Sequence, residues 1–116
     1  MGTLRTPETE AAYTKVKEEG HLREGCVLCT IPSVKEFNEW RIIENRFPYD
    51  LIASVHHMIL PKRHTAELSK SEQKEYEEIK ETYMQPTYEF FIEPVNRQRS
   101  IPEHWHLHLI TAKHTY

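Results

Sequence analysis

The chain has 116 residues, with 15 basic and 18 acidic side chains and a formal net charge of −3. This length suits one domain that can bury a core without disulfide bonds or a structural metal. Only 38% of the residues are hydrophobic, but 2 Trp, 6 Tyr and 4 Phe can anchor that core. The aromatic content argues against a disordered tail. The slight acidic excess argues against a surface for a nucleic acid polymer.

The sequence shows neither the pattern of a membrane span nor that of a secretory signal. No run approaches the ~18 apolar residues of a membrane span. Residues 1–15 lack the apolar stretch of about 7–15 residues that a secretory signal requires. We therefore expect a cytoplasmic protein with no membrane partner, folded as a single domain over 1–116, with a helical extension at 1–20 and a core at 26–110.

The N-terminal half predicts one helix and two strands. A short helix is expected at 6–20, because Thr6 can cap it, Pro7 suits its first position and Gly20 can end it. The segments that follow predict a turn at 30–33, a strand at 40–45, a proline turn at 47–50 and a strand at 53–60.

The C-terminal half predicts one long helix followed by two strands. The run from Ser69 to Glu72 is a capping box, which opens a helix that Pro86 is expected to end. Strands are expected at 88–93 and 105–110. Strands, one long helix and further strands favour an α+β domain with an antiparallel sheet of about five strands, rather than βαβ alternation.

The two cysteines form a Cys-x-x-Cys motif at Cys26 and Cys29. Such a motif is half of a zinc site, a redox pair or two plain thiols. A structural disulfide is disfavoured because no secretory signal is seen. A redox pair is expected at the start of a helix, whereas a turn is predicted at 30–33. The metal interpretation is favoured, and it requires two further ligands.

The segment His104-Trp105-His106-Leu107-His108-Leu109-Ile110 carries the strongest chemical signal. Alternation along a strand would put three imidazoles on one face and the apolar side chains on the other. Three histidines on one face stabilise a sheet poorly, since each ring needs polar partners and their charged forms repel. The face is a solvated polar surface, a metal-binding surface or a catalytic surface, and the pattern favours the catalytic one.

This segment resembles the signature of the histidine triad superfamily of nucleotidyl hydrolases and transferases, in which three histidines alternate with hydrophobic residues. The run from His56 to His64 resembles the superfamily's histidine, hydrophobic strand and Pro-Lys-x-His element. Asn45, followed by Phe47 and Pro48, matches its Asn-x-x-Pro element. The Cys-x-x-Cys motif is placed as in the zinc-containing branch, which includes bacterial histidine triad proteins and galactose-1-phosphate uridylyltransferase.

The resemblance implies a division of roles among these residues. His106 would be the nucleophile that attacks an α-phosphate, and His108 would hydrogen-bond the phosphate oxygens. A structural zinc would be held by four ligands: Cys26, Cys29, His64 and His104. A neutral imidazole is nucleophilic near pH 7, so a covalent nucleotidyl-histidine intermediate is chemically reasonable at this site.

The resemblance also implies substrate contacts and partners. Asn45 and His56 would line the site, and Asn96 and Ser100 would supply hydrogen-bond donors. The substrate would be a small nucleotide conjugate: a dinucleoside polyphosphate, a nucleotide sugar or a nucleoside phosphoramidate. A homodimer is also implied. The segment between Asn96 and Glu103 is short and lacks glycine, and Ser100 precedes His104 by four residues rather than the usual three, which leaves the substrate open.

Two other functions compete with this one. The first is a non-catalytic, zinc-stabilised module that binds nucleotides or a partner. The second is a metalloenzyme in which the three histidines jointly hold a catalytic metal, as in other three-histidine zinc sites. The middle histidine disfavours the first, and the second would leave the cysteine pair without its ligand partners. His57, His21 and His114 are interpreted as incidental.

Overall fold

The computed structural model describes residues 4–18, 26–95 and 103–113. Over these ranges five strands form one antiparallel sheet in the order β1-β2-β3-β5-β4. The strands are β1 Ser33–Glu36, β2 Trp40–Glu44, β3 Ala53–Pro61, β4 Phe90–Ile92 and β5 Leu107–Ala112, and the helical segments are α1 Pro7–Glu18, α2 Val27–Thr30, α3 Lys70–Ile79, η2 Lys80–Met84 and α4 Gln85–Thr87. This confirms the predicted α+β class and antiparallel sheet.

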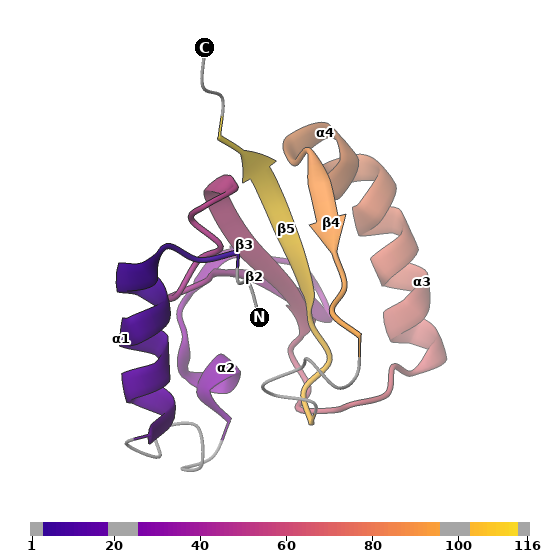
Figure 1. The fold of residues 1–116 in the computed structure, drawn as a ribbon. Coiled ribbons are helices and arrows are strands. Elements are labelled where there is room, and N and C mark those ends of the chain that lie inside the picture. The colour runs from indigo at the N-terminus through magenta and orange to yellow at the C-terminus, as the bar shows by residue number, and fades with distance from the viewer. Residues whose placement is uncertain (1–3, 19–25, 96–102, 114–116) are drawn as a thin grey trace.

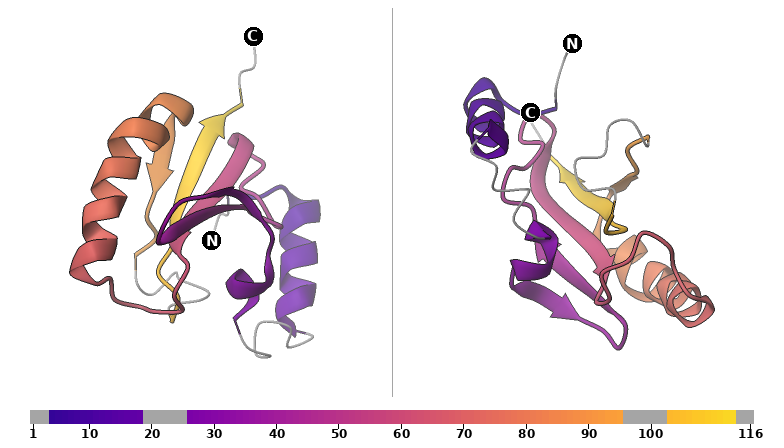
Figure 2. Two further views of the ribbon diagram at one scale, coloured as in Figure 1. Left: turned by 180° about the vertical axis from the view of Figure 1, so that it is seen from behind. Right: turned by 90° about the horizontal axis from the view of Figure 1, so that it is seen from below.

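The sheet is covered differently on its two faces. The long helical segment formed by α3, η2 and α4 runs along one face, and α2 lies on the opposite side with α1 beside it (Figure 1 and Figure 2). Among the described residues, none of these helices has the length and apolar character needed to cross a bilayer.

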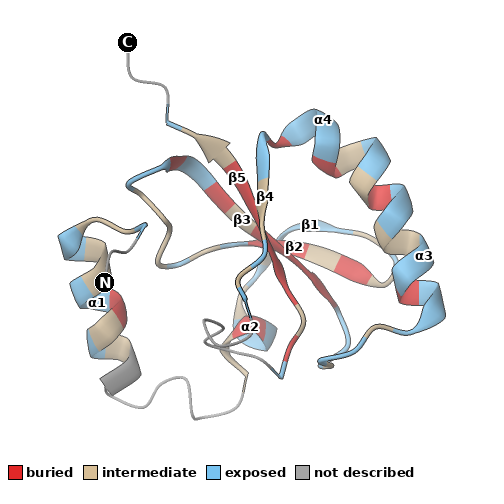
Figure 3. Ribbon diagram, turned by 45° about the vertical axis from the view of Figure 1, so that its right-hand side comes forward, coloured by how far each residue is buried: buried red, intermediate tan, exposed pale blue. Residues whose placement is uncertain are grey.

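Two apolar clusters hold the layers together. Neighbouring strand residues point to opposite faces, so Ile42 joins the core beneath α3, whereas Ile43 joins a smaller cluster beneath α2. The larger cluster contains Trp40, Ile42, Ile59, Ile79, Met84, Tyr88, Leu107 and Leu109, and the smaller one contains Leu28, Ile43, Met58 and Leu60. Burial is concentrated along the central strands and on the inner side of α3 (Figure 3).

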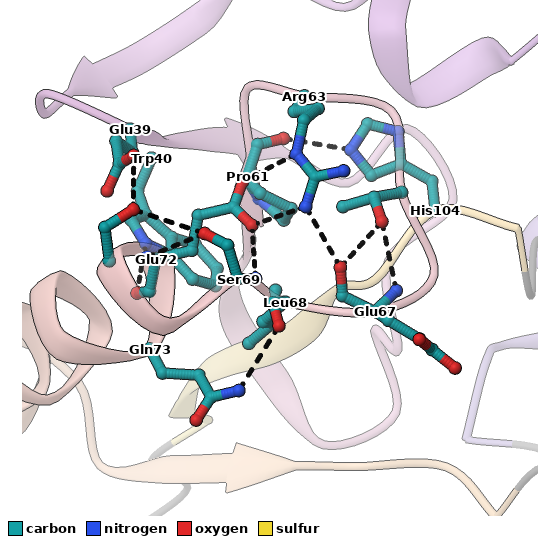
Figure 4. Close-up of polar contacts among 12 residues, drawn as sticks. Glu39, Trp40, Pro61, Arg63, Glu67, Leu68, Ser69, Glu72, Gln73 and His104 are labelled. Carbon is teal, nitrogen blue, oxygen red and sulfur yellow. Dashed lines mark hydrogen bonds and ion pairs between the residues drawn. The ribbon is translucent and has the colours of Figure 1, made fainter.

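The N-terminus of α3 contains the predicted capping box. Ser69 Oγ accepts the Glu72 N–H at 3.2 Å, and the Glu72 carboxylate accepts the Ser69 N–H at 2.8 Å. The same carboxylate accepts a hydrogen bond from Arg63 at 2.7 Å, and the Trp40 indole donates to the Glu72 carbonyl at 2.9 Å (Figure 4). The loop at 62–69, which contains His64, is therefore attached to both the helix and the sheet.

The prediction that Pro86 ends the long helix is wrong. The helix continues to Thr87 through the π-helical turn η2, in which the Gln85 N–H bonds to the Lys80 carbonyl. A proline ring in a regular α-helix clashes with the carbonyl four residues earlier, which here belongs to Thr82. The wider turn η2 ends at Met84, two residues before the proline, and a π turn at this place relieves that clash, so the chain stays helical to Thr87.

Other elements also differ from the predictions, either in their bounds or because they were not predicted. Strand β1 was not predicted, because its side chains are mostly exposed and Val34 is its single apolar residue. Strand β5 begins at Leu107 rather than at 105, and β4 spans Phe90–Ile92 rather than 88–93. The N-terminal helix is described to Glu18, so its predicted end at Gly20 lies outside the described residues.

Replacing Glu72 by glutamine is expected to lower the free energy of unfolding by about 1–3 kcal/mol at pH 7, because the carboxylate of this side chain (5% exposed) accepts from both Arg63 and Ser69. Hydrogen bonding from Arg63 lowers the pKa of Glu72. The stabilisation that the ionised Glu72 side chain contributes is therefore complete above the pKa of glutamate in the unfolded chain. It is lost as the pH falls through the lower pKa that Glu72 has in the folded protein.

Urea denaturation of wild type and variant at neutral and acidic pH measures both effects. Glu78→Gln on the exposed side of α3 is the matched control, and we expect it to change the free energy of unfolding by less than about 0.5 kcal/mol. Equal stabilities of Glu72→Gln and wild type at pH 7 would contradict the prediction.

Candidate metal centre and histidine cluster

The face of the sheet beneath α2 carries the predicted functional residues. His104 and His106 lie in the segment that leads into β5, and His108 lies within the strand. The ring centroids of His106 and His108 are 5.4 Å apart. The intervening Trp105 packs against Trp40 in the opposite core, at 5.3 Å between centroids. The expected alternation therefore holds across the segment, although regular strand pairing begins only at Leu107.

The four predicted metal ligands come together. Cys26 and Cys29 belong to the knuckle around α2, His64 follows β3, and His104 precedes β5. Their potential ligand atoms all lie within 4.8 Å of one another. This cluster joins segments that are as much as 78 residues apart in the sequence.

The spacing of these atoms fits a tetrahedral cation. The Cys26 and Cys29 sulfurs lie 3.4 and 3.5 Å from Nδ1 of His104, and the Cys29 sulfur lies 3.6 Å from Nδ1 of His64. Zinc bonds of about 2.3 Å to sulfur and about 2.0 Å to nitrogen, at tetrahedral angles, place sulfur and nitrogen about 3.5 Å apart. The residues present therefore fit a zinc-like cation with four protein ligands.

His104 is oriented for this role at both ring nitrogens. Its Nε2 lies 2.9 Å from the Pro61 carbonyl (Figure 4). A carbonyl only accepts, so the ring proton is on Nε2 and Nδ1 carries the lone pair that faces the sulfurs. Burial lowers the pKa of His104, which favours the neutral form that a metal requires.

The cysteine knuckle is a single helical turn. Cys26 is the N-cap of α2, and the Cys29 N–H bonds to the Cys26 carbonyl at 3.1 Å. Buried Leu28 anchors the turn in the smaller apolar cluster. This helix was not predicted: α2 ends at Thr30, where a turn was expected to begin, because a four-residue helix leaves no periodic pattern to read.

His106 has a defined tautomer. Its Nδ1 lies 2.9 Å from the main-chain carbonyl of His104, so Nδ1–H donates and Nε2 carries the lone pair. The side chain is buried, with 7% of its surface exposed. A neutral imidazole held in this way presents one nucleophilic nitrogen, while the hydrogen bond at the other stabilises positive charge on the ring.

His56 and His108 form a second ordered pair. Nδ1 of His56 accepts the Tyr49 N–H at 2.9 Å, so the proton of the neutral His56 ring is on Nε2. That Nε2 lies 2.7 Å from Nδ1 of His108 and donates to it. His108 therefore carries its own proton on Nε2. Burial, aided by the charges of Arg5 and His57, lowers the pKa of His56 to about 3, so the ring is neutral at pH 7.

Tyr49 supports this histidine pair, a role that sequence reasoning did not predict. Its ring stacks on His108 at 5.1 Å and lies tilted against His56 at 4.5 Å, both measured between ring centroids. On its other side the guanidinium carbon of Arg5 lies 4.9 Å from the Tyr49 centroid and 4.2 Å from that of Tyr13. This stack attaches the beginning of α1 to the histidine cluster, and no sequence motif signals it.

The remaining predicted site residues are Asn45, Asn96 and Ser100, and three further histidines were interpreted as incidental. Asn45 lies beside His56, with its amide nitrogen 3.2 Å from Nε2 of that ring and its amide oxygen accepting the Phe47 N–H at 2.8 Å. Asn96 and Ser100 lie outside the described residues, as do His21 and His114. His57 projects from the opposite face, where its Nδ1 lies 2.7 Å from the Tyr88 hydroxyl.

No protein-family model matches the sequence, and no curated protein matches it significantly. What the site can do chemically is therefore inferred from its residue pattern and from the geometry of the metal cluster and the histidine cluster.

Proposed function

We propose that this protein is a nucleotidyl hydrolase or transferase of the histidine triad type, which acts at the α-phosphate of a nucleotide conjugate through a covalent intermediate on His106. The observation that carries the proposal is the hydrogen bond from Nδ1 of His106 to the His104 carbonyl, which leaves Nε2 as the nucleophilic nitrogen. The resemblance of residues 104–110 to the histidine triad signature supports the same assignment.

The reaction divides into two displacements at phosphorus. In the first, the lone pair of His106 Nε2 attacks the α-phosphate, a P–N bond forms, and the leaving group departs with its bonding pair and takes up a proton. In the second, water or another acceptor attacks phosphorus, the P–N bond breaks, and its pair returns to Nε2, while the proton of the attacking water passes to solvent and balances the one that the leaving group took from solvent. The donor on Nε2 of His108 stabilises negative charge on the phosphoryl oxygens during both steps.

The metal has a structural role in this proposal. A zinc ion would be held by both cysteines together with His64 and His104, and when bound it would tie α2 to the end of β3 and the start of β5. Four protein ligands leave no position for a reacting water. The main-chain carbonyl of His104 orients His106. The proposed metal ligand His104 is therefore in direct contact with the proposed nucleophile.

The test is release of nucleoside monophosphate from a panel of conjugates. We would use diadenosine tetraphosphate, an adenosine phosphoramidate, ADP-glucose and UDP-glucose, follow products by chromatography, and search for a nucleotidyl mass adduct after rapid acid-free quenching. Release together with an adduct on His106 is the expected result. No release and no adduct, with zinc bound and the fold intact, would favour the non-catalytic binding module.

We further propose that the protein works as a cytoplasmic homodimer on small-molecule substrates. Light scattering coupled to size-exclusion chromatography measures the assembly directly, and a species of monomer mass at all concentrations would overturn the dimer.

Replacing His56 by alanine is expected to slow turnover about 10–100-fold, because His108 then loses the donor that keeps its proton on Nε2 and its ring is held less firmly. The matched control is His57→Ala, which removes the adjacent histidine from the opposite face of the sheet. Steady-state kinetics on the best substrate of the panel measures both. Equal rates for the two variants would contradict a role for His56 in orienting His108.

A further inference from the structure

Arg41 makes an unusual set of contacts beneath the cysteine knuckle. It lies on β2 beside Ile42, which faces the larger core, so its side chain points to the opposite face, toward α2. There the guanidinium donates to the carbonyls of Leu28 and Ile31, at 2.5 Å for Ile31, and to Ser33 Oγ at 3.0 Å. One side chain therefore spans the segment from α2 to the start of β1.

The two carbonyl acceptors are groups that a one-turn helix cannot satisfy. The last carbonyls of a helix lack partners within it, and a helix of four residues is too short to be stable alone. Leu28 and Ile31 bracket Cys29 in the sequence, and Ile31 is the C-cap of α2. The hydrogen bonds from Arg41 therefore hold the main chain on both sides of the second cysteine.

Apolar packing holds one side of the cysteine knuckle. Leu28 is 3% exposed and anchors one side of α2 in the apolar cluster, but Cys29 and Thr30 are exposed. Cys26 and Ile31 are partly buried against the same cluster, so apolar packing sets the position of the turn, but it leaves the second cysteine exposed. The planar guanidinium, with donors in a rigid fork, can set the direction of that cysteine's thiol by binding several acceptors at once.

We propose that Arg41 is a positioning residue for the metal centre, which holds α2 in the conformation that presents both thiols and so preorganises the site for a divalent cation such as zinc. The inference depends on the geometry of the metal cluster and not on the proposed nucleotidyl chemistry. Nothing in the Cys-x-x-Cys or histidine motifs marks this arginine, since it lies in β2 and reaches the knuckle only in the folded chain.

The test compares zinc affinity among Arg41→Gln, Arg41→Lys and wild type, by competition with a chromophoric chelator. We expect Arg41→Gln to bind zinc about 10–100-fold more weakly, as is typical when support around metal ligands is lost. Arg41→Lys should recover little of the affinity, because an ammonium cannot bind the separated acceptors as the fork does. Arg46→Gln, which removes an exposed charge near the end of β2, is the matched control and should bind as wild type does.

A second readout separates positioning from a change of ligands. Cobalt(II) bound to wild type and to both variants should show intense visible bands of a tetrahedral cysteine–histidine site, with saturation shifted to higher cobalt in the variants. Affinities of folded variants within about twofold of wild type would overturn the proposal, as would an equal loss in Arg46→Gln. If Arg41→Gln does not fold, Arg41→Lys carries the test: wild-type affinity in it would overturn the role of the fork.

Discussion

Replacing His106 by asparagine is expected to abolish nucleotide release, with a fall in the first-order rate on the order of 10⁴-fold or more, as when other enzymes lose a nucleophile. The proposed reaction passes through a bond between phosphorus and Nε2 of His106. Asparagine offers no comparable nucleophilic nitrogen, but its amide N–H can still donate to the His104 carbonyl as the imidazole does. Single-turnover kinetics on the best substrate, with mass spectrometry of the quenched protein, measures the loss.

The controls for this variant are its zinc content and its thermal unfolding, both of which should match those of wild type. The adduct seen in wild type should be absent. Release within about tenfold of wild type, or an adduct on another residue, would show that His106 is not the nucleophile and would overturn the proposed mechanism.

Loss of the metal is expected to lower stability far more than turnover. At zinc concentrations about 1,000 times the dissociation constant, binding to the folded state stabilises it by about 4 kcal/mol. For a chain of this size that corresponds to roughly 15 °C in the midpoint of thermal unfolding. We therefore expect Cys26→Ser to unfold at a temperature lower by about that amount, since serine is a poor zinc ligand and the tetrahedral set is broken.

The chelator experiment supplies an internal control. A strong chelator should lower the midpoint of wild type toward that of Cys26→Ser and should leave the variant unchanged. Turnover per folded molecule, measured well below both midpoints, should change much less than stability. Unchanged stability with activity lost would contradict a structural role for the metal, and metal analysis that finds no zinc after chelator-free purification would exclude the site.

Metal substitution separates the triad mechanism from a catalytic metal. If His106 is the nucleophile, cobalt or cadmium in the cysteine–histidine site should leave the rate near that of the zinc form, provided the fold survives. A catalytic metal held by the three histidines would change the rate sharply with the identity of the ion. The separation of roles between His104, which faces the cysteines, and His106, which bonds to a carbonyl, favours the first result.

Much of this architecture was readable from local patterns. Alternation over residues 104–110 predicted that Leu107 and Leu109 face the core while the histidines face the other way, and the structure confirms this. The prediction was possible because period-two alternation is a local property of extended backbone. The capping box at Ser69 was likewise predictable, since its partners are three residues apart. The resemblance to histidine triad proteins also pointed to four metal-ligand candidates, and the fold brings all four together as a possible metal site.

The π turn, strand β1 and the histidine tautomers depend on tertiary contacts and could not be predicted from local sequence patterns. The π turn before Pro86 depends on how the ring fits the preceding helix, and β1 exists because β2 offers it an edge to pair with. The tautomers of His56, His106 and His108 depend on which acceptors and donors the fold brings to each nitrogen. A sequence records which rings are present, but a ring's proton is set by partners that become neighbours only when distant segments pack together.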